Sequence, residues 1–144
     1  VKIAGSASAS DTLALHDRKD MLYFDTAQIS AGKAMKQVGL TLNDIHLFEY
    51  HDVFSIYAAL QLEAVGFAIK GRGWKLATDN EISLKGKIPC ATMGGMKPMG
   101  AGLMGAKPGT YLVTITVTSP KGAKIAKAIV CPISVMLIFT REYL

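Results

Sequence analysis

Between residues 45 and 65 a strand pattern runs into a helix pattern, and this junction constrains the fold more than any other feature of the sequence. Residues 45–50 (IHLFEY) alternate weakly in hydropathy, which favours a central β-strand. A helical pattern follows as far as Val65, and Gly66 supplies a stop signal. His51 lies at the junction. Because ligands of α/β sheets bind beyond the carboxyl ends of strands, this histidine is a candidate functional residue.

A second strand–helix pair precedes the first. Residues 1–9 are typical of a strand that runs into a loop, and apolar positions at helical spacing predict a helix from about Ala27 to Val38, stopped by Gly39. Two such pairs in succession indicate a layered α/β fold. Asp25 or Thr26 is the candidate N-cap of this helix, and Asp52 or Ser55 is expected to start the helix that ends at Val65.

The rest of the chain is less regular. Residues 71–89 are polar and contain glycines, which predicts a long surface loop. Residues 94–109 are dense in glycine. Residues 110–118 and 128–139 are rich in β-branched side chains, so each favours a strand, and the second of these strands is expected to be buried.

The size and charge of the chain restrict its class. Its 144 residues, half of them hydrophobic, fit one domain. No apolar run approaches the roughly 20 residues of a membrane-spanning helix, and the N-terminus has no signal-peptide pattern. The 16 basic residues give a formal net charge of +5 but are scattered, which disfavours nucleic-acid binding. The first residue, Val1, suggests that an upstream part was removed or that the chain was processed.

Two cysteines, Cys90 and Cys131, argue against a disulfide-rich secreted protein and indicate a reducing cytoplasmic location. Neither belongs to a Cys-x-x-Cys or Cys/His motif, so we expect no metal site. Cys131 lies in an apolar run, where a free cysteine usually acts as a small core residue. A catalytic role for it would need an exposed, electropositive setting.

Two groups of residues could carry chemistry. His51 can donate a hydrogen bond to a developing oxyanion; alternatively, neighbouring backbone or Asp52 satisfies its ring. Gly94, Gly95 and Gly100 belong to a glycine-rich loop that would let a ligand approach the backbone. Alternatively, these glycines form a tight structural turn, because the segment matches neither a Walker loop nor a dinucleotide-binding fingerprint.

Five stretches of the chain together resemble the C-terminal domain of the thiolases, with the greatest similarity to the sterol-carrier-protein-type and archaeal branch. Their order and separation agree with that family from about residue 6 to residue 105. The stretches are Ser10–Arg18 (SDTLALHDR), Val38-Gly39 followed by Asn43-Asp44-Ile45, Glu49–Phe54 (EYHDVF), Leu62–Phe67 (LEAVGF) and Gly94–Gly100 (GGMKPMG).

This resemblance implies a layered α/β domain, with a mixed sheet and helices on its faces, that spans residues 1–144 and forms the second half of a two-half enzyme. A cysteine of the first half, which this chain lacks, would take the acyl group from a coenzyme A thioester, and no bound cofactor would be needed. The resemblance also implies a cytoplasmic homodimer or higher oligomer. A partner protein with an OB fold that binds acyl-CoA is a further candidate.

The resemblance assigns His51 to an oxyanion hole, but three other positions depart from the family pattern. Ala101 stands where thiolases carry the histidine that activates the nucleophile. Val53 stands where sterol-carrier-type members carry a cysteine. Cys131 falls near the C-terminal cysteine loop of ordinary thiolases, although residues 132–135 lack the glycines of that loop. Loss of one oxyanion donor typically costs about 2.7–4 kcal/mol of transition-state stabilisation, and loss of the base should remove most thiolase chemistry.

Three hypotheses follow. The chain could be an acyl-CoA C-acyltransferase domain with impaired chemistry, inactive when isolated because the nucleophile is elsewhere. It could be a non-catalytic subunit that binds acyl-CoA or a protein partner. It could also belong to a related lyase in which Tyr50 or Tyr57 transfers the proton. The family places a helix after the glycine loop, whereas residues 110–118 favour a strand.

Overall fold

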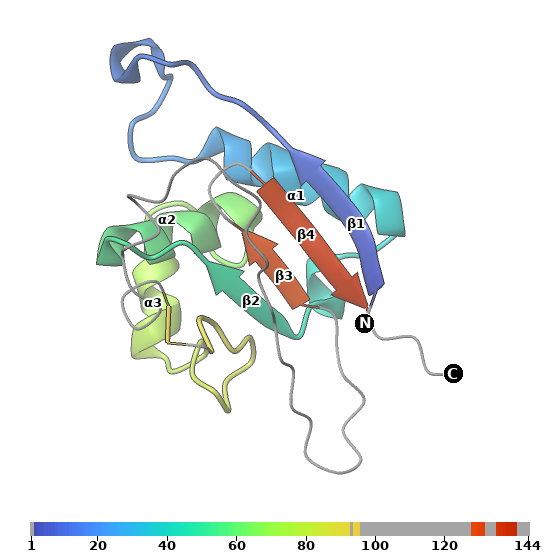
Figure 1. The fold of residues 1–144 in the computed structure, drawn as a ribbon. Coiled ribbons are helices and arrows are strands. Elements are labelled where there is room, and N and C mark those ends of the chain that lie inside the picture. Colours follow the sequence, from blue (N-terminus) through green and yellow to red (C-terminus); the bar gives the residue numbers. More distant parts are fainter. Residues whose placement is uncertain (1, 93, 96–127, 132–134, 141–144) are drawn as a thin grey trace.

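The computed structural model describes residues 2–92, 94–95, 128–131 and 135–140, which form helices and strands around one mixed sheet (Figure 1). The strand order is β1-β4-β3-β2. The β1/β4 and β3/β4 pairs are antiparallel, whereas β2 and β3 are parallel. The elements are β1 (Lys2–Ser8), η1 (Leu15–Asp17), α1 (Asp25–Val38), η2 (Leu42–Asp44), β2 (Leu47–Tyr50), α2 (Ser55–Val65), α3 (Gly73–Thr78), β3 (Ala128–Cys131) and β4 (Val135–Thr140).

Helices α1 and α2 lie side by side on one face of the sheet (Figure 1). Small residues make this close packing feasible on the α1 side, since Ala27, Ala31 and Ala34 recur at helical spacing and are at most 1% exposed. On the sheet side, a methyl group added to Gly5 of β1 would lie 2.9 Å from the carbonyl oxygen of Ala34. A glycine in β1 and alanines in α1 therefore let the helix approach the sheet closely.

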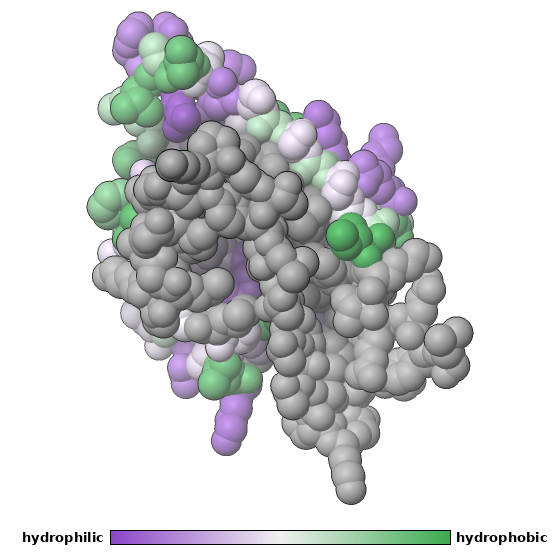
Figure 2. Space-filling view, in the orientation of Figure 1, coloured by the Kyte–Doolittle hydropathy of each residue, from purple (hydrophilic) through white to green (hydrophobic). Residues whose placement is uncertain are grey.

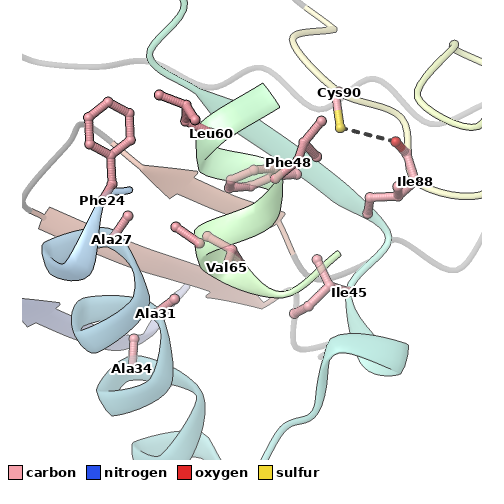
Figure 3. Packing of buried hydrophobic residues seen from close by; sticks show 12 residues of the cluster. Phe24, Ala27, Ala31, Ala34, Ile45, Phe48, Leu60, Val65, Ile88 and Cys90 are labelled. Atoms are coloured by element: carbon pink, nitrogen blue, oxygen red, sulfur yellow. Dashed lines mark hydrogen bonds between the residues drawn. The ribbon is translucent and has the colours of Figure 1, made fainter. Parts of the chain in front are cut away.

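Phe48 of β2 is fully buried at the centre of the core (Figure 3). Its ring lies 5.3 Å from that of Phe67 and 5.5 Å from that of Tyr50, within the usual range for aromatic pairs. Leu60 and Val65 of α2 complete the cluster above the sheet. Strand β2, which leads to His51, is thus anchored by the best-buried large side chain of the described core.

Residues 9–22 project from the body of the molecule and carry η1 (Figure 1). Hydrophobic and hydrophilic side chains alternate on this projection (Figure 2). Large apolar side chains that are mostly exposed include Leu13, Leu15, Met21 and Leu22. Such a group of exposed apolar residues is typical of an interaction surface.

The predicted helices and the α/β content are confirmed, and so is Ser55 as the start of α2, but the predicted N-cap of α1 is wrong. Helix α1 begins at Asp25 with Phe24 in the cap position, and α2 begins at Ser55 with Phe54 in that position, without a side-chain cap bond in either case. Packing explains the difference, because the rings of Phe24 and Phe54 both make edge contacts with Tyr57, at 5.2 and 5.3 Å. An aromatic contact thus replaces the expected polar cap of α1, and a second one lies at the start of α2.

Three further predictions needed correction. The segment 71–89 is not wholly irregular, because it contains helix α3, which packs against α2. The apolar run 128–139 is not one strand but two antiparallel ones, β3 and β4. Strand β2 begins at Leu47 rather than at residue 45. The predicted strand 110–118 lies outside the described residues. No helix within the described part of the chain is long and apolar enough to span a membrane.

Candidate functional site

Strand β2 places His51 at its carboxyl end, where the chain turns toward α2. The side chain of His51 is half-buried. Its ring centroid lies 6.5 Å from that of Tyr57, with the two rings inclined by 35°. Tyr57 belongs to the first turns of α2, so the end of the strand and the start of the helix bring these two rings together.

The backbone of His51 is held by the side chain of Gln61, a residue of α2 with no exposed surface. The His51 N–H donates to Oε1 of Gln61 at 3.2 Å, and Nε2 of Gln61 donates to the His51 carbonyl oxygen. The same Nε2 also donates to the carbonyl oxygen of Tyr57 at 3.3 Å. One buried amide therefore contacts the backbone of both residues whose rings lie together.

The start of the glycine-rich loop reaches the same end of β2. Residues 89–91 run beside the strand, because Phe48 N–H donates to the Pro89 carbonyl at 2.9 Å and Ala91 N–H donates to the Phe48 carbonyl at 3.1 Å. Gly94 and Gly95 follow with φ of 92° and 75°, values that favour glycine. This segment and the His51 segment, 40 residues apart in the chain, are thereby brought together.

Glu49 of β2 ties the approach to these glycines to the strand. Its Oε1 accepts hydrogen bonds from the Thr92 N–H at 2.7 Å and from the Thr92 hydroxyl at 2.6 Å. Hydrogen bonds to a carboxylate are stronger than those between neutral groups. Glu49 thus fixes the position of the chain two residues before Gly94.

Burial raises the pKa of two side chains near this strand end, Tyr50 and Cys90. Desolvation, with a smaller contribution from Cys90, Asp52 and Glu49, raises the pKa of the Tyr50 phenol to about 12. Desolvation, followed by the charge of Glu49, raises the pKa of the Cys90 thiol to about 12. Both groups are therefore neutral near pH 7. Cys90 is not set up as a thiolate nucleophile, whereas a neutral phenol can still donate a hydrogen bond.

The structure describes the other predicted site residues only in part. The backbone of Cys131 ends β3 and pairs in register with Tyr50, one residue before His51. The side chain of Cys131, together with Gly100 and Ala101, lies outside the described residues. Val53 is half-buried between β2 and α2. Within the described ranges, no group of three or more His, Cys, Asp or Glu residues could hold a metal ion.

Sequence reasoning missed Gln61 and Thr92 as parts of this site. For Gln61 a signal existed, since one amide interrupts the apolar residues Leu60 and Leu62 on a helix whose C-terminal half is buried. A buried amide needs hydrogen-bond partners, which points to a structural bond across the fold. Thr92 carries no comparable signal. Chemically, the arrangement offers an imidazole at the end of β2, with Gly95 packed against the neighbouring Asp52; the Gly94 N–H already donates to the Ala91 carbonyl at 2.8 Å.

A family model and several curated proteins match this chain. A family model described as "Thiolase C-terminal domain-like" matches residues 7–113. An acetyl-CoA acetyltransferase of Methanothermobacter thermautotrophicus is 42% identical over 100 residues, which cover 69% of this chain and 26% of that protein. Human sterol carrier protein 2 is 35% identical over 85 residues, covering 56% of this chain and 16% of that protein.

A solved structure titled "Ltp2-ChsH2(DUF35) aldolase" superposes with a TM-score of 0.61 at 26% sequence identity. The match covers 65% of this chain and 25% of that chain. In the two curated proteins above, the matched part likewise amounts to about a quarter of the length or less.

Proposed function

The chain belongs to the thiolase family, and on that premise we propose that residues 1–144 form the C-terminal domain of a divergent, two-half acyl-CoA C-acyltransferase whose thiolase chemistry is impaired or lost. The observation that carries the proposal is the close packing of Gly95 against Asp52, the residue after His51, at the end of β2. The substrate class is a coenzyme A thioester. The relatives named as acetyl-CoA acetyltransferases support this choice.

In this proposal His51 stabilises charge rather than attacking the substrate. An imidazole N–H donates a hydrogen bond to the thioester oxygen as that oxygen gains negative charge. The first half of the protein supplies the nucleophile. Ala101 and Val53 carry a methyl and an isopropyl group, neither of which can accept or deliver a proton. The reaction therefore lacks a base, and we expect slow or absent thiolysis.

The test is a thiolysis assay of the full-length protein with acetoacetyl-CoA and free coenzyme A. We expect turnover well below that of an ordinary thiolase, and a further fall of about 10²–10³ in kcat for His51→Ala. The matched control is His46→Ala, since His46 is exposed at the opposite end of the strand. Ordinary turnover would overturn the impairment, and an unchanged rate in His51→Ala would remove His51 from the mechanism.

A related lyase is the second candidate, and the solved aldolase among the structural matches favours it. Tyr57 lies against the ring of His51, and Tyr50 is neutral near pH 7, so either phenol could donate a proton. The corresponding test is retro-aldol cleavage of a β-hydroxyacyl-CoA. Loss of that cleavage in Tyr57→Phe or Tyr50→Phe, with His46→Ala unaffected, would favour the lyase over the acyltransferase.

A non-catalytic role is the third candidate. The exposed apolar side chains of residues 9–22 support a surface for a partner, such as the other half of the protein, a second copy in a homodimer, or an acyl-CoA-binding protein with an OB fold. A layered mixed sheet with helices on its faces and a cytoplasmic location are part of the same proposal. Binding of acyl-CoA in calorimetry without turnover of either kind would favour this role.

A further inference from the structure

The parallel ladder between β2 and β3 ends with the pair Tyr50 and Cys131. His51 follows immediately, and its N–H and C=O groups both bond to the side chain of Gln61. A primary amide carries a donor and an acceptor side by side, as a peptide group does. The amide of Gln61 therefore acts as a one-residue extension of the sheet.

The orientation of the amide is determined by its partners. Oε1 faces the His51 N–H, and Nε2 faces the carbonyl oxygens of His51 and Tyr57. A rotation by 180° would set N–H against N–H and oxygen against two carbonyl oxygens. Since Gln61 has no exposed surface, water cannot replace a lost bond at little cost. The amide thus has one favourable arrangement, and so does the His51 backbone that it contacts.

We propose that Gln61 is a positioning residue of this site, which fixes the backbone of His51 relative to Tyr57 and so directs the imidazole toward the substrate. The proposal rests on the proposed function in that it takes His51 to contact the substrate. Gln61 itself does not touch the reacting atoms. Its effect is transmitted through the three hydrogen bonds to the backbone of His51 and Tyr57.

The variant that tests this is Gln61→Met in the full-length protein, because methionine has a similar length and volume but no amide. Gln28→Met is the matched control, since Gln28 is an exposed glutamine of α1. Gln61→Glu is a second variant: it keeps the acceptor for the His51 N–H but replaces the donor by an oxygen. Circular dichroism confirms that each variant folds.

The first readout is amide hydrogen exchange at His51, which does not depend on activity. We expect exchange to be about tenfold faster in Gln61→Met and unchanged in Gln28→Met. Unchanged exchange in Gln61→Met would overturn the proposal. This readout remains decisive if the wild-type protein shows no turnover, which the proposed function allows. Ordinary thiolase turnover would contradict the proposed function alone.

The second readout is kinetic. Displacement of a catalytic group by about 1 Å can cost on the order of 10²-fold in rate, so we expect kcat to fall about 10- to 100-fold with little change in KM. In a His51→Ala background, Gln61→Met should have no further effect, because the group that it positions is gone. An equal loss in both backgrounds would show that Gln61 supports only the fold, and would overturn the positioning role.

Discussion

A methyl group added to Gly95 would lie 2.0 Å from Oδ2 of Asp52, well inside any normal contact. Asp52 follows His51, so this contact joins the glycine loop to the histidine segment. The φ of Gly95 is 75°, which side chains rarely adopt. Both the space and the backbone conformation at this position therefore require glycine.

We predict that Gly95→Ala lowers the free energy of unfolding by about 1–3 kcal/mol, because the clash and the backbone strain act together. Urea denaturation measures the change. The control is Gly32→Ala, since Gly32 lies in α1 with no atom within 4 Å of the added methyl group. There alanine should raise stability by about 0.5–1 kcal/mol. Equal stability of Gly95→Ala and the wild type would contradict the close contact.

The bonds from Thr92 to Glu49 lead to a second prediction. Removing the carboxylate in Glu49→Ala should cost about 1.5–3 kcal/mol, the usual range for hydrogen bonds to charged groups. Glu49→Gln keeps the accepting oxygen and should cost much less. In a double-mutant cycle with Thr92→Val, the two effects should be less than additive, because each removes the same hydroxyl bond. Full additivity would show that the hydroxyl bond does not contribute.

The sequence predicted the part of the site that depends on local patterns. Helices α1 and α2 end just before Gly39 and Gly66, both with positive φ, as their stop signals indicated. Alternation in β2 and the apolar pattern of α2 together located His51 at a strand end. These features depend on residues that are close in the chain, so they could be recognised without knowledge of the tertiary structure.

The bonds of the site could not be predicted, because they join residues that are distant in the chain. Thr92 bonds to Glu49 across 43 positions, and nothing in the threonine side chain specifies that partner. Helix α3 was missed for the same reason: residues 71–89 are polar and contain three glycines, and the part that is helical packs against α2. The split of residues 128–139 was missed because strand pairing, rather than composition, separates β3 from β4.

Helix α3 gives a third prediction. A methyl group on Gly73 would lie 2.3 Å from the carbonyl oxygen of Ala59, and the Gly73 N–H donates to Oε1 of the buried Glu63 at 2.7 Å. Gly73→Ala should therefore destabilise the protein by about 1–3 kcal/mol through overpacking. Thermal unfolding measures the loss. Gly71→Ala serves as the neighbouring control, since no atom lies within 4 Å there and only its positive φ of 77° adds strain.

The raised pKa values of Tyr50 and Cys90 predict how stability depends on pH. Each group is neutral when protonated, and its pKa in the folded protein is about 12, compared with ordinary values of 10.0 and 9.0. Above about pH 9 the unfolded chain therefore releases protons that the folded protein retains, so the free energy of unfolding falls as pH rises toward 12. Below about pH 8 both states are protonated and this contribution is constant.

Urea denaturation between pH 7 and pH 11 tests this dependence. Cys90→Ala and Tyr50→Phe each remove one titrating group, so in each variant stability should fall less steeply with pH than in the wild type. The difference should be clear by pH 9 in Cys90→Ala and by pH 10 in Tyr50→Phe, since half of each group is ionised at these values in the unfolded chain. A pH dependence identical to that of the wild type in both variants would show that neither group is desolvated in the folded protein. Such a result would contradict the burial of Cys90 beside β2.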